Sequence, residues 1–152
     1  MHRSGTSVLG GVLERLGVCL PGEQIAADQH NPSGYFEWSS VVDLQERLLI
    51  DLDRWWPSYS GTKPLPKNWL ESPATLGAKS RLSDLLRSES HRQQGLWAIK
   101  DPRSSLLLPL WFELAQELNL PLRLLTARSP LSVSSTSGEL RSSSSAKCNA
   151  VS

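Results

Sequence analysis

The chain has 152 residues, 39% of them hydrophobic, which is enough for one domain with a real core. Its net charge of +1 and the absence of a basic stripe disfavour nucleic acid as a partner. No apolar run approaches membrane-spanning length, and polar residues follow Met1, so we expect a cytoplasmic protein that is not an integral membrane protein. Two cysteines, Cys19 and Cys148, form neither a disulfide framework nor a metal site, and we expect no metal.

Apolar residues at helical spacing predict three helices in the first 90 residues. The first pattern covers residues 6–16, the second residues 41–49 and the third residues 82–86. Residues 20–36 are rich in Pro, Gly, Asn and Asp, and residues 55–77 contain several prolines and tryptophans, so both are predicted to be loops.

The second part of the chain adds two short apolar runs. Residues 96–99 and 122–127 are predicted to be strands, with a helix over residues 105–117 between them. Strands that alternate with helices favour an α/β fold with a parallel sheet, in which ligands bind at the carboxyl ends of the strands. Residues 142–152 are Ser-rich without periodicity and are predicted to be a disordered tail.

A polar run at the start of the first helix has the composition of an anion-binding loop. It consists of Arg3, Ser4, Gly5, Thr6 and Ser7. Free N–H groups at a helix start attract anions, glycine permits close approach of the backbone, and the hydroxyls and the guanidinium add donors. The alternative is that Ser4 or Thr6 is only a helix N-cap. The run is not a Walker A motif, because Gly5 is followed by Thr6 and the required lysine is missing.

Charged residues lie at two further places, one directly after the first predicted strand and one directly before the second predicted helix. Lys100, Asp101 and Arg103 suit a strongly anionic ligand, or else form a solvated turn in which Asp101 pairs with a cation. Glu37 ends the turn-forming stretch Asn-Pro-Ser-Gly-Tyr-Phe-Glu, where the helix dipole favours an acid, so it is either a helix-start acid or a catalytic base.

An arginine also follows the second predicted strand. Arg128, with hydroxyls at Ser134, Ser135 and Thr136, can clamp a second phosphate. The alternative interpretation of these residues is a Ser-rich helix start.

The order of these motifs resembles the sulfotransferase family, in particular its bacterial members. The motifs are Arg-Ser-Gly-Thr-Ser, Asn-Pro-Ser-Gly-Tyr-Phe-Glu, Ile-Lys-Asp-Pro-Arg and Arg-Ser-Pro, and the resemblance covers residues 1–141. It implies 3′-phosphoadenosine 5′-phosphosulfate as co-substrate and a P-loop NTPase-like three-layer α/β fold, with helices on both faces of a parallel sheet. Family members have a strand before the loop and run well past residue 152, so we expect a partial domain that lacks the first strand and the C-terminal part.

The resemblance also implies roles for individual residues. The loop of residues 3–7 corresponds to the binding loop for the 5′-phosphosulfate, and Arg128 with Thr136 to the residues that hold the 3′-phosphate. Lys100 corresponds to the lysine that stabilises charge at the transferring sulfuryl group. The histidine base of many cytosolic members is absent here, which leaves Glu37 and Asp101 as candidates for the base.

The function implied by the resemblance is transfer of the sulfuryl group to a hydroxyl or amine of a small molecule or glycan. Two alternatives remain open. One is a P-loop phosphotransferase or NTPase, which the missing lysine disfavours. The other is a non-catalytic remnant that binds adenosine phosphates, because a partial domain is expected to show little transfer.

Overall fold

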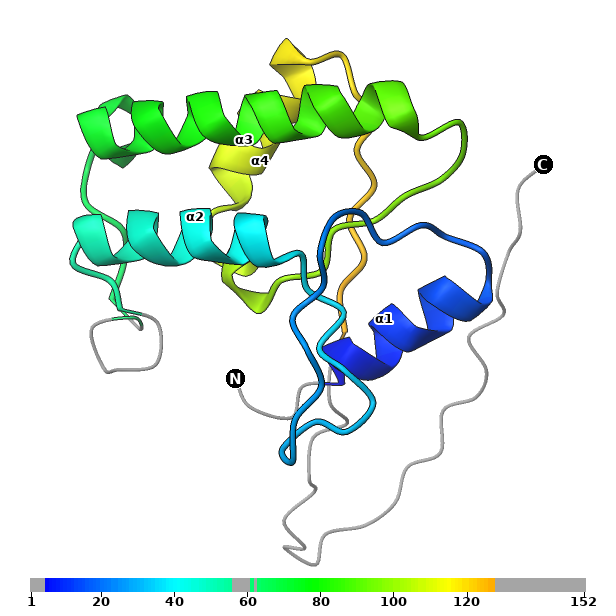
Figure 1. The fold of residues 1–152 in the computed structure, drawn as a ribbon. Coiled ribbons are helices and arrows are strands. Elements are labelled where there is room, and N and C mark those ends of the chain that lie inside the picture. Colours follow the sequence, from blue (N-terminus) through cyan, green and yellow to red (C-terminus); the bar gives the residue numbers. More distant parts are fainter. Residues whose placement is uncertain (1–4, 56–60, 62, 128–152) are drawn as a thin grey trace, which may run out of the picture.

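Helices dominate the computed structural model, which describes residues 5–55, 61 and 63–127 (Figure 1). The α-helices are α1 (Thr6–Arg15), α2 (Ser39–Asp51), α3 (Pro73–Arg92) and α4 (Leu108–Glu117), and the short 3-10 helices are η2 (Trp69–Glu71) and η3 (Pro102–Ser105). In Figure 1, α2 and α3 run antiparallel to each other, α4 crosses behind α3, and α1 lies to one side with the loop that follows it.

Glycines define both ends of α1. Gly5 precedes the helix with a φ of 79°, and Gly17 follows it with a φ of 81°. At the carboxyl end the N–H of Gly17 donates to the carbonyl of Glu14, and the N–H of Val18 donates to that of Leu13. These bonds satisfy carbonyls that the helix leaves open, and the left-handed conformation that they require is one that glycine adopts without steric cost.

A serine cap and a proline start α3 earlier than the hydrophobic pattern predicts. The Ser72 side chain accepts a hydrogen bond from the N–H of Thr75, and Pro73 occupies the first helical position, where its missing N–H costs nothing. The proline-rich stretch predicted as a loop to residue 77 therefore ends at Ser72. The helices predicted over residues 6–16 and 41–49 are confirmed by α1 and α2. The helix predicted over residues 105–117 is confirmed by α4, which begins three residues later, at Leu108.

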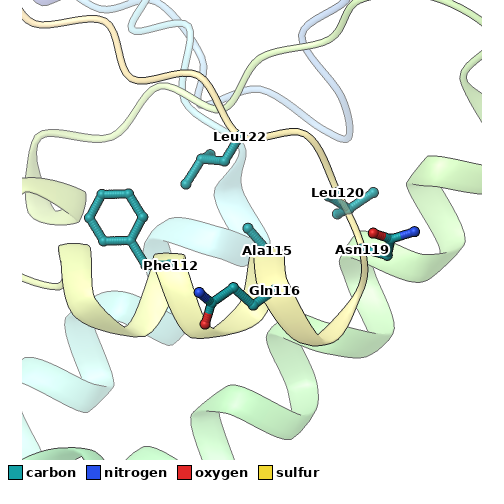
Figure 2. A pocket seen from close by; sticks show the side chains of 6 residues that line it. All are labelled: Phe112, Ala115, Gln116, Asn119, Leu120 and Leu122. Atoms are coloured by element: carbon teal, nitrogen blue, oxygen red, sulfur yellow. The ribbon is translucent and has the colours of Figure 1, made fainter.

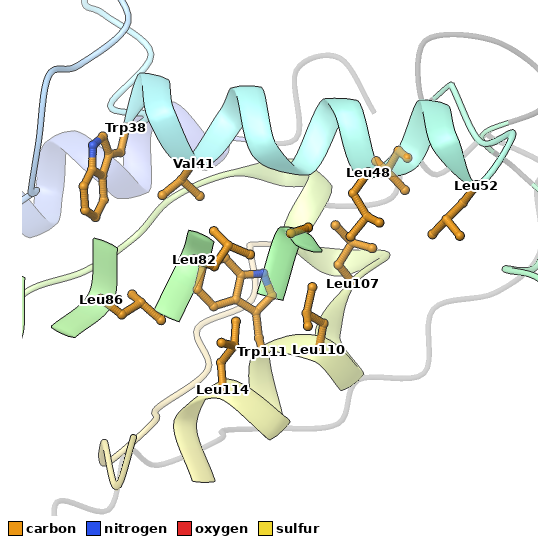
Figure 3. Close-up of a cluster of buried hydrophobic side chains, with 12 residues drawn as sticks. Trp38, Val41, Leu48, Leu52, Leu82, Leu86, Leu107, Leu110, Trp111 and Leu114 are labelled. Atoms are coloured by element: carbon orange, nitrogen blue, oxygen red, sulfur yellow. The ribbon is translucent and has the colours of Figure 1, made fainter. Parts of the chain in front are cut away.

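The core lies between α2, α3 and α4 (Figure 3). Helical spacing on each of the three helices brings its large apolar side chains to the same face, where they exclude water. The buried apolar side chains are Trp38, Val41, Leu48, Leu49, Leu52, Ala78, Leu82, Leu86, Leu107, Leu110, Trp111 and Leu114.

A double ion pair ties α3 to α4 at the edge of this core. The ammonium of Lys79 donates to Glu113 at 2.7 Å and to Glu117 at 2.6 Å. The two hydrogen bonds raise the pKa of Lys79 above its usual value. These ion pairs thus link α3 to α4 through residues that are about thirty-five positions apart in the sequence.

The long loop between α1 and α2 folds back on itself before α2 begins. Gln24 and Trp38 form an isolated antiparallel bridge, with the N–H of Ile25 donating to the carbonyl of Glu37 at 2.9 Å. Gly22, with a φ of 72°, lies against the indole of Trp38, and a Cβ built on it would lie 1.9 Å from the indole nitrogen. This close packing fixes the backbone on both sides of Glu37.

The prediction of a three-layer parallel sheet is wrong for the part of the chain that the structure describes. Residues 96–99 make one isolated parallel bridge, between Trp97 and Cys19, and residues 122–127 make none. A strand needs a ladder of partners, because an extended segment alone leaves its backbone groups unpaired. Leu96 is 77% exposed, and Leu122, Leu124 and Leu125 are also exposed, so neither run is the buried strand that its composition predicted.

Some predictions concern residues outside the described ranges. They are the disordered tail over residues 142–152, the domain boundary at residue 141, and the placement of Arg3, Ser4, Arg128 and Thr136.

Candidate functional site

The side chain of Lys100 is buried against the segment that precedes α2. Its ammonium donates to a carboxylate oxygen of Glu37 at 2.5 Å and to the backbone carbonyl of Tyr35 at 2.9 Å. The Lys100 side chain is 9% exposed and that of Glu37 is 8% exposed. Two of the three donors of the ammonium are thus engaged, which leaves one for a further acceptor.

Arg103 joins the same group of charges from η3. Its guanidinium lies 3.0 Å from Asp101, 3.6 Å from the second oxygen of Glu37 and 3.4 Å from Glu46. Glu37 therefore lies between two cations, Lys100 and Arg103. Removing one member of such a buried pair leaves an uncompensated charge and costs about 3–5 kcal/mol.

Asp101 is almost completely enclosed, with a side chain that is 1% exposed. One carboxylate oxygen accepts from the backbone N–H of Arg103 at 2.9 Å and from its guanidinium, and the other accepts from the amide of Gln45 at 2.6 Å. The bond to the N–H of Arg103 caps η3, in which Pro102 is the first residue. Asp101 thus forms the turn that follows Lys100.

The start of α1 is linked to the loop that carries Glu37. The side-chain amide of Asn31 donates to the hydroxyl of Ser7 at 3.1 Å and to the carbonyl of Gly34 at 2.7 Å. Lys100 contacts the carbonyl of Tyr35, the residue directly after Gly34. The structure therefore brings together three of the motifs, around residues 7, 31–37 and 100–103, that are far apart in the sequence.

The amino end of α1 contains the part of the predicted anion loop that the structure describes. Gly5 has a left-handed conformation, and among the described residues no side chain caps the helix and no atom lies within 4 Å of a Cβ built on Gly5. The first N–H groups of an uncapped helix point outward along its axis and carry its partial positive charge. The described part of the predicted anion loop, Gly5 to Ser7, thus begins with backbone N–H groups that could meet an anion, and the alternative of a Ser4 cap concerns a residue outside the described ranges.

Phe36 packs on α1 and fixes the distance between this helix and the Glu37 loop. Its φ is 58°, which is unusual for a residue other than glycine. A Cβ built on Gly10 would lie 2.7 Å from the Cβ of Phe36, and one built on Gly11 would lie 3.3 Å from its ring. Backbone strain of this kind is found at functional sites, where surrounding contacts hold it in place.

An exposed hydrogen bond shapes the same loop further from Lys100. The hydroxyl of Tyr35 donates to Asp28 at 2.9 Å, and the other oxygen of Asp28 accepts from the N–H groups of His30 and Asn31. The hydrogen bond from Tyr35, with those backbone bonds, lowers the pKa of Asp28, and the same bond raises the pKa of Tyr35. These contacts hold the backbone of Asn31 in the turn from which its side chain reaches Ser7.

Sequence reasoning missed Asn31 and Gln45 as single residues. Asn31 was part of a turn-forming stretch, and nothing in its neighbours indicated a partner 24 positions away. Gln45 offered a signal, since it lies four residues after Val41 and three before Leu48 on the buried face of α2. A polar side chain on an apolar helix face requires a hydrogen-bonding partner inside the protein.

A separate hollow of about 390 Å³ lies on the outer side of α4 and includes none of the predicted site residues (Figure 2). It is lined by Phe112, Ala115, Gln116, Asn119, Leu120 and Leu122. Among the described residues, no group of three or more His, Cys, Asp and Glu is placed to hold a metal ion. No helix in the same part of the chain combines the length and apolar character needed to cross a membrane.

Comparison with known proteins adds no relative to these observations: no family model, curated protein or solved structure matches the chain.

Proposed function

We propose that this chain binds 3′-phosphoadenosine 5′-phosphosulfate at the cluster formed by the start of α1, residues 31–37 and Lys100, and that its activity is sulfuryl transfer. The observation that carries the proposal is the chain of contacts from Ser7 through Asn31 and the Tyr35 carbonyl to Lys100. The same residues carry the resemblance to sulfotransferases. The proposal rests on this cluster and that resemblance.

The residues fit the sulfated end of such a donor. The uncapped N–H groups after Gly5 supply donors and the positive end of a helix dipole. Lys100 supplies a fixed positive charge with one donor still open, and its low exposure strengthens its interaction with an anion. Arg128 and Thr136, outside the described residues, are proposed for the 3′-phosphate on the resemblance alone.

In the proposed reaction, an acceptor oxygen or nitrogen attacks the sulfur and the bond from sulfur to the 5′-phosphate oxygen breaks. The proton of the acceptor passes to solvent water, and 3′-phosphoadenosine 5′-phosphate leaves with the bonding electron pair. Lys100 and the N–H groups of α1 would offset the charge that develops on the oxygen between phosphorus and sulfur. The acceptor is a hydroxyl or amine of a small molecule or glycan.

The contacts of Glu37 and Asp101, the two candidates for the catalytic base, favour a structural role for both carboxylates. Protonating Glu37 would weaken its pairs with Lys100 and Arg103, and both oxygens of Asp101 already accept hydrogen bonds. We therefore assign both carboxylates to holding the cations in place.

Calorimetric titration with 3′-phosphoadenosine 5′-phosphate tests the binding step. We expect wild-type protein to bind it more tightly than ATP with magnesium, and Lys100→Met to lower its affinity about tenfold or more, as for a lost hydrogen bond to a charged group. Lys79→Met is the matched control, because Lys79 is also paired with two carboxylates, but it belongs to α3 and its partners are in α4, outside the candidate site. Tighter magnesium-dependent binding of ATP would refute the proposal and favour a nucleotide phosphotransferase.

Transfer itself is tested by following label from the phosphosulfate donor to a panel of hydroxyl and amine acceptors. Binding without transfer to any of them would instead favour a non-catalytic adenosine phosphate binder.

A further inference from the structure

Gln45 is a glutamine in the middle of the apolar core, with no exposed surface. Its amide nitrogen donates to Asp101 at 2.6 Å. Its amide oxygen accepts from the indole N–H of Trp111 at 2.9 Å and from the hydroxyl of Ser104 at 3.1 Å. The side chain thus joins α2 to the turn after Lys100, to η3 and to α4.

The chemistry of its partners explains why this position holds an amide. The indole of Trp111 can only donate, so it must face the amide oxygen, and the carboxylate of Asp101 accepts, so it must face the amide nitrogen. A glutamate in the same place would put two carboxylates in contact, and an apolar side chain would leave a buried carboxylate and a buried indole N–H without this partner. Among side chains of this length, glutamine alone satisfies both partners at once.

The contacts continue from Gln45 to Lys100. Asp101 is bonded to Gln45 through one oxygen and to the backbone and guanidinium of Arg103 through the other. Arg103 lies against Glu37, which holds the Lys100 ammonium. Asp101 is also the next residue in the chain after Lys100, so a shift of Asp101 moves the backbone of Lys100 directly.

We propose that Gln45 is a positioning residue, which sets the place of Lys100 by fixing Asp101 and the turn over residues 101–104. This inference deepens the proposed function and rests on it for the consequence that Gln45 controls donor affinity. The geometric part, that Gln45 holds Lys100 in its buried position, is independent of any ligand.

Lysine labelling measures the geometric part directly. Protein is treated with an acetylating reagent, and the rate of modification at each lysine is followed by mass spectrometry in wild type and in Gln45→Met, which keeps the size of the side chain and removes its hydrogen bonds. We expect the rate at Lys100 to rise about tenfold, the equivalent of one lost hydrogen bond to a charged group. Lys79, held by Glu113 and Glu117 away from Gln45, is the internal reference and should keep its rate.

A gentler variant covers the case in which Gln45→Met does not fold. Trp111→Phe removes the donor that orients the amide and keeps an aromatic side chain in the core. It should raise labelling at Lys100 by a smaller factor than Gln45→Met and leave Lys79 unchanged. Thr75→Val is the stability control, since Thr75 is a fully buried polar residue in α3 whose hydrogen bonds are made to Ser72.

Titration of the same proteins with 3′-phosphoadenosine 5′-phosphate separates the two proposals. Weaker binding by Gln45→Met and Trp111→Phe, with Thr75→Val equal to wild type, supports the positioning role. An unchanged labelling rate at Lys100 in both folded variants, or a rise shared equally by Lys79, overturns it. Failure of wild-type protein to bind the bisphosphate, with Lys100 released selectively, overturns the proposed function and leaves the positioning role standing.

Discussion

Substituting Gly10 with alanine should destabilise the protein, although alanine is the better helix former. Gly10 lies within α1, and a Cβ there would be 2.7 Å from the Cβ and 3.0 Å from the Cγ of Phe36. Gly77 lies within α3, and a Cβ there would meet nothing within 4 Å. The two positions therefore share the same intrinsic helix preference and differ in the space that the side chain finds.

The magnitude follows from which atom must move. Alanine gains about 1 kcal/mol over glycine inside a helix, and this gain should appear in full at Gly77. At Gly10 the nearest atom is the Cβ of Phe36, which no side-chain rotation can move, so the backbone of Phe36 must shift. Overpacking of this kind costs about 1–3 kcal/mol. Gly10→Ala should therefore be about 1–3 kcal/mol less stable than Gly77→Ala.

Gly11→Ala gives an intermediate case on the same helix. Its Cβ would lie 3.3 Å from the far end of the Phe36 ring, which can yield by a small rotation. We expect its free energy of unfolding to lie between those of the other two variants.

Urea unfolding followed by circular dichroism gives the free energies, and hydrogen exchange of the α1 amides reports on this helix alone. Faster exchange in Gly10→Ala than in wild type is expected. If Gly10→Ala instead raised stability as much as Gly77→Ala and left α1 exchange unchanged, the packing of Phe36 on α1 would be refuted.

Three further changes test other contacts. Ser72→Ala removes the cap that accepts from the N–H of Thr75, and it should lower the free energy of unfolding in urea by about 1 kcal/mol. If the double variant with Thr75→Ala loses no more than Ser72→Ala alone, the two side chains stabilise the helix start through the same contact. Because the pKa of Lys79 is raised in the folded protein, its ion pairs stabilise the fold fully below pH 10.5, the ordinary pKa of lysine, and this stabilisation is lost as the pH rises through the folded-state pKa. The difference in free energy of unfolding between wild type and Lys79→Met should therefore shrink at strongly alkaline pH. Tyr35 should ionise above pH 10.0 in an ultraviolet titration, and Asp28→Asn should bring its pKa down toward that value; an unchanged titration would exclude the hydrogen bond between them.

Local sequence signals predicted the helices because their physical causes are local. Apolar spacing predicted α1, although Gly10 is its only buried residue and Val8 and Leu16 are exposed. Gly17 marks the end of the helix through a conformation that glycine adopts easily. The true start of α3 was also present in the sequence as Ser72 and Pro73, a cap followed by a proline at the first helical position. The hydrophobic pattern alone did not predict it, because the buried positions of the first two turns hold the small residues Thr75 and Ala78, while Leu76 is exposed.

Apolar runs led to the wrong prediction of a sheet, because a strand depends on partners elsewhere in the chain. Leu96–Ile99 has the composition of a buried strand, yet it obtains one bridge, to Cys19. A short apolar run does not distinguish a paired strand from an extended segment.

The residues of the candidate site were singled out individually, but not the way in which they combine. Lys100 and Glu37 are 63 positions apart, and no local pattern indicates that their side chains meet. Their chemistry suggested an anion site and a base, whereas in the structure Glu37 pairs with Lys100, whose ammonium keeps one donor for another acceptor. Gln45 is the exception, because a polar residue in register with Val41 and Leu48 can be recognised as one that needs an internal partner.

The two carboxylates that bind Lys79 restrict how α4 can move relative to α3. Glu113 and Glu117 are separated by one turn of α4, a rise of about 6 Å along the helix axis. A single tether would allow α4 to swivel about the point of attachment. With two acceptors on successive turns around one ammonium, sliding of α4 along its axis in either direction lengthens one of the two contacts. α4 is thereby braced against α3 at the end of the helix from which the chain continues toward residue 127.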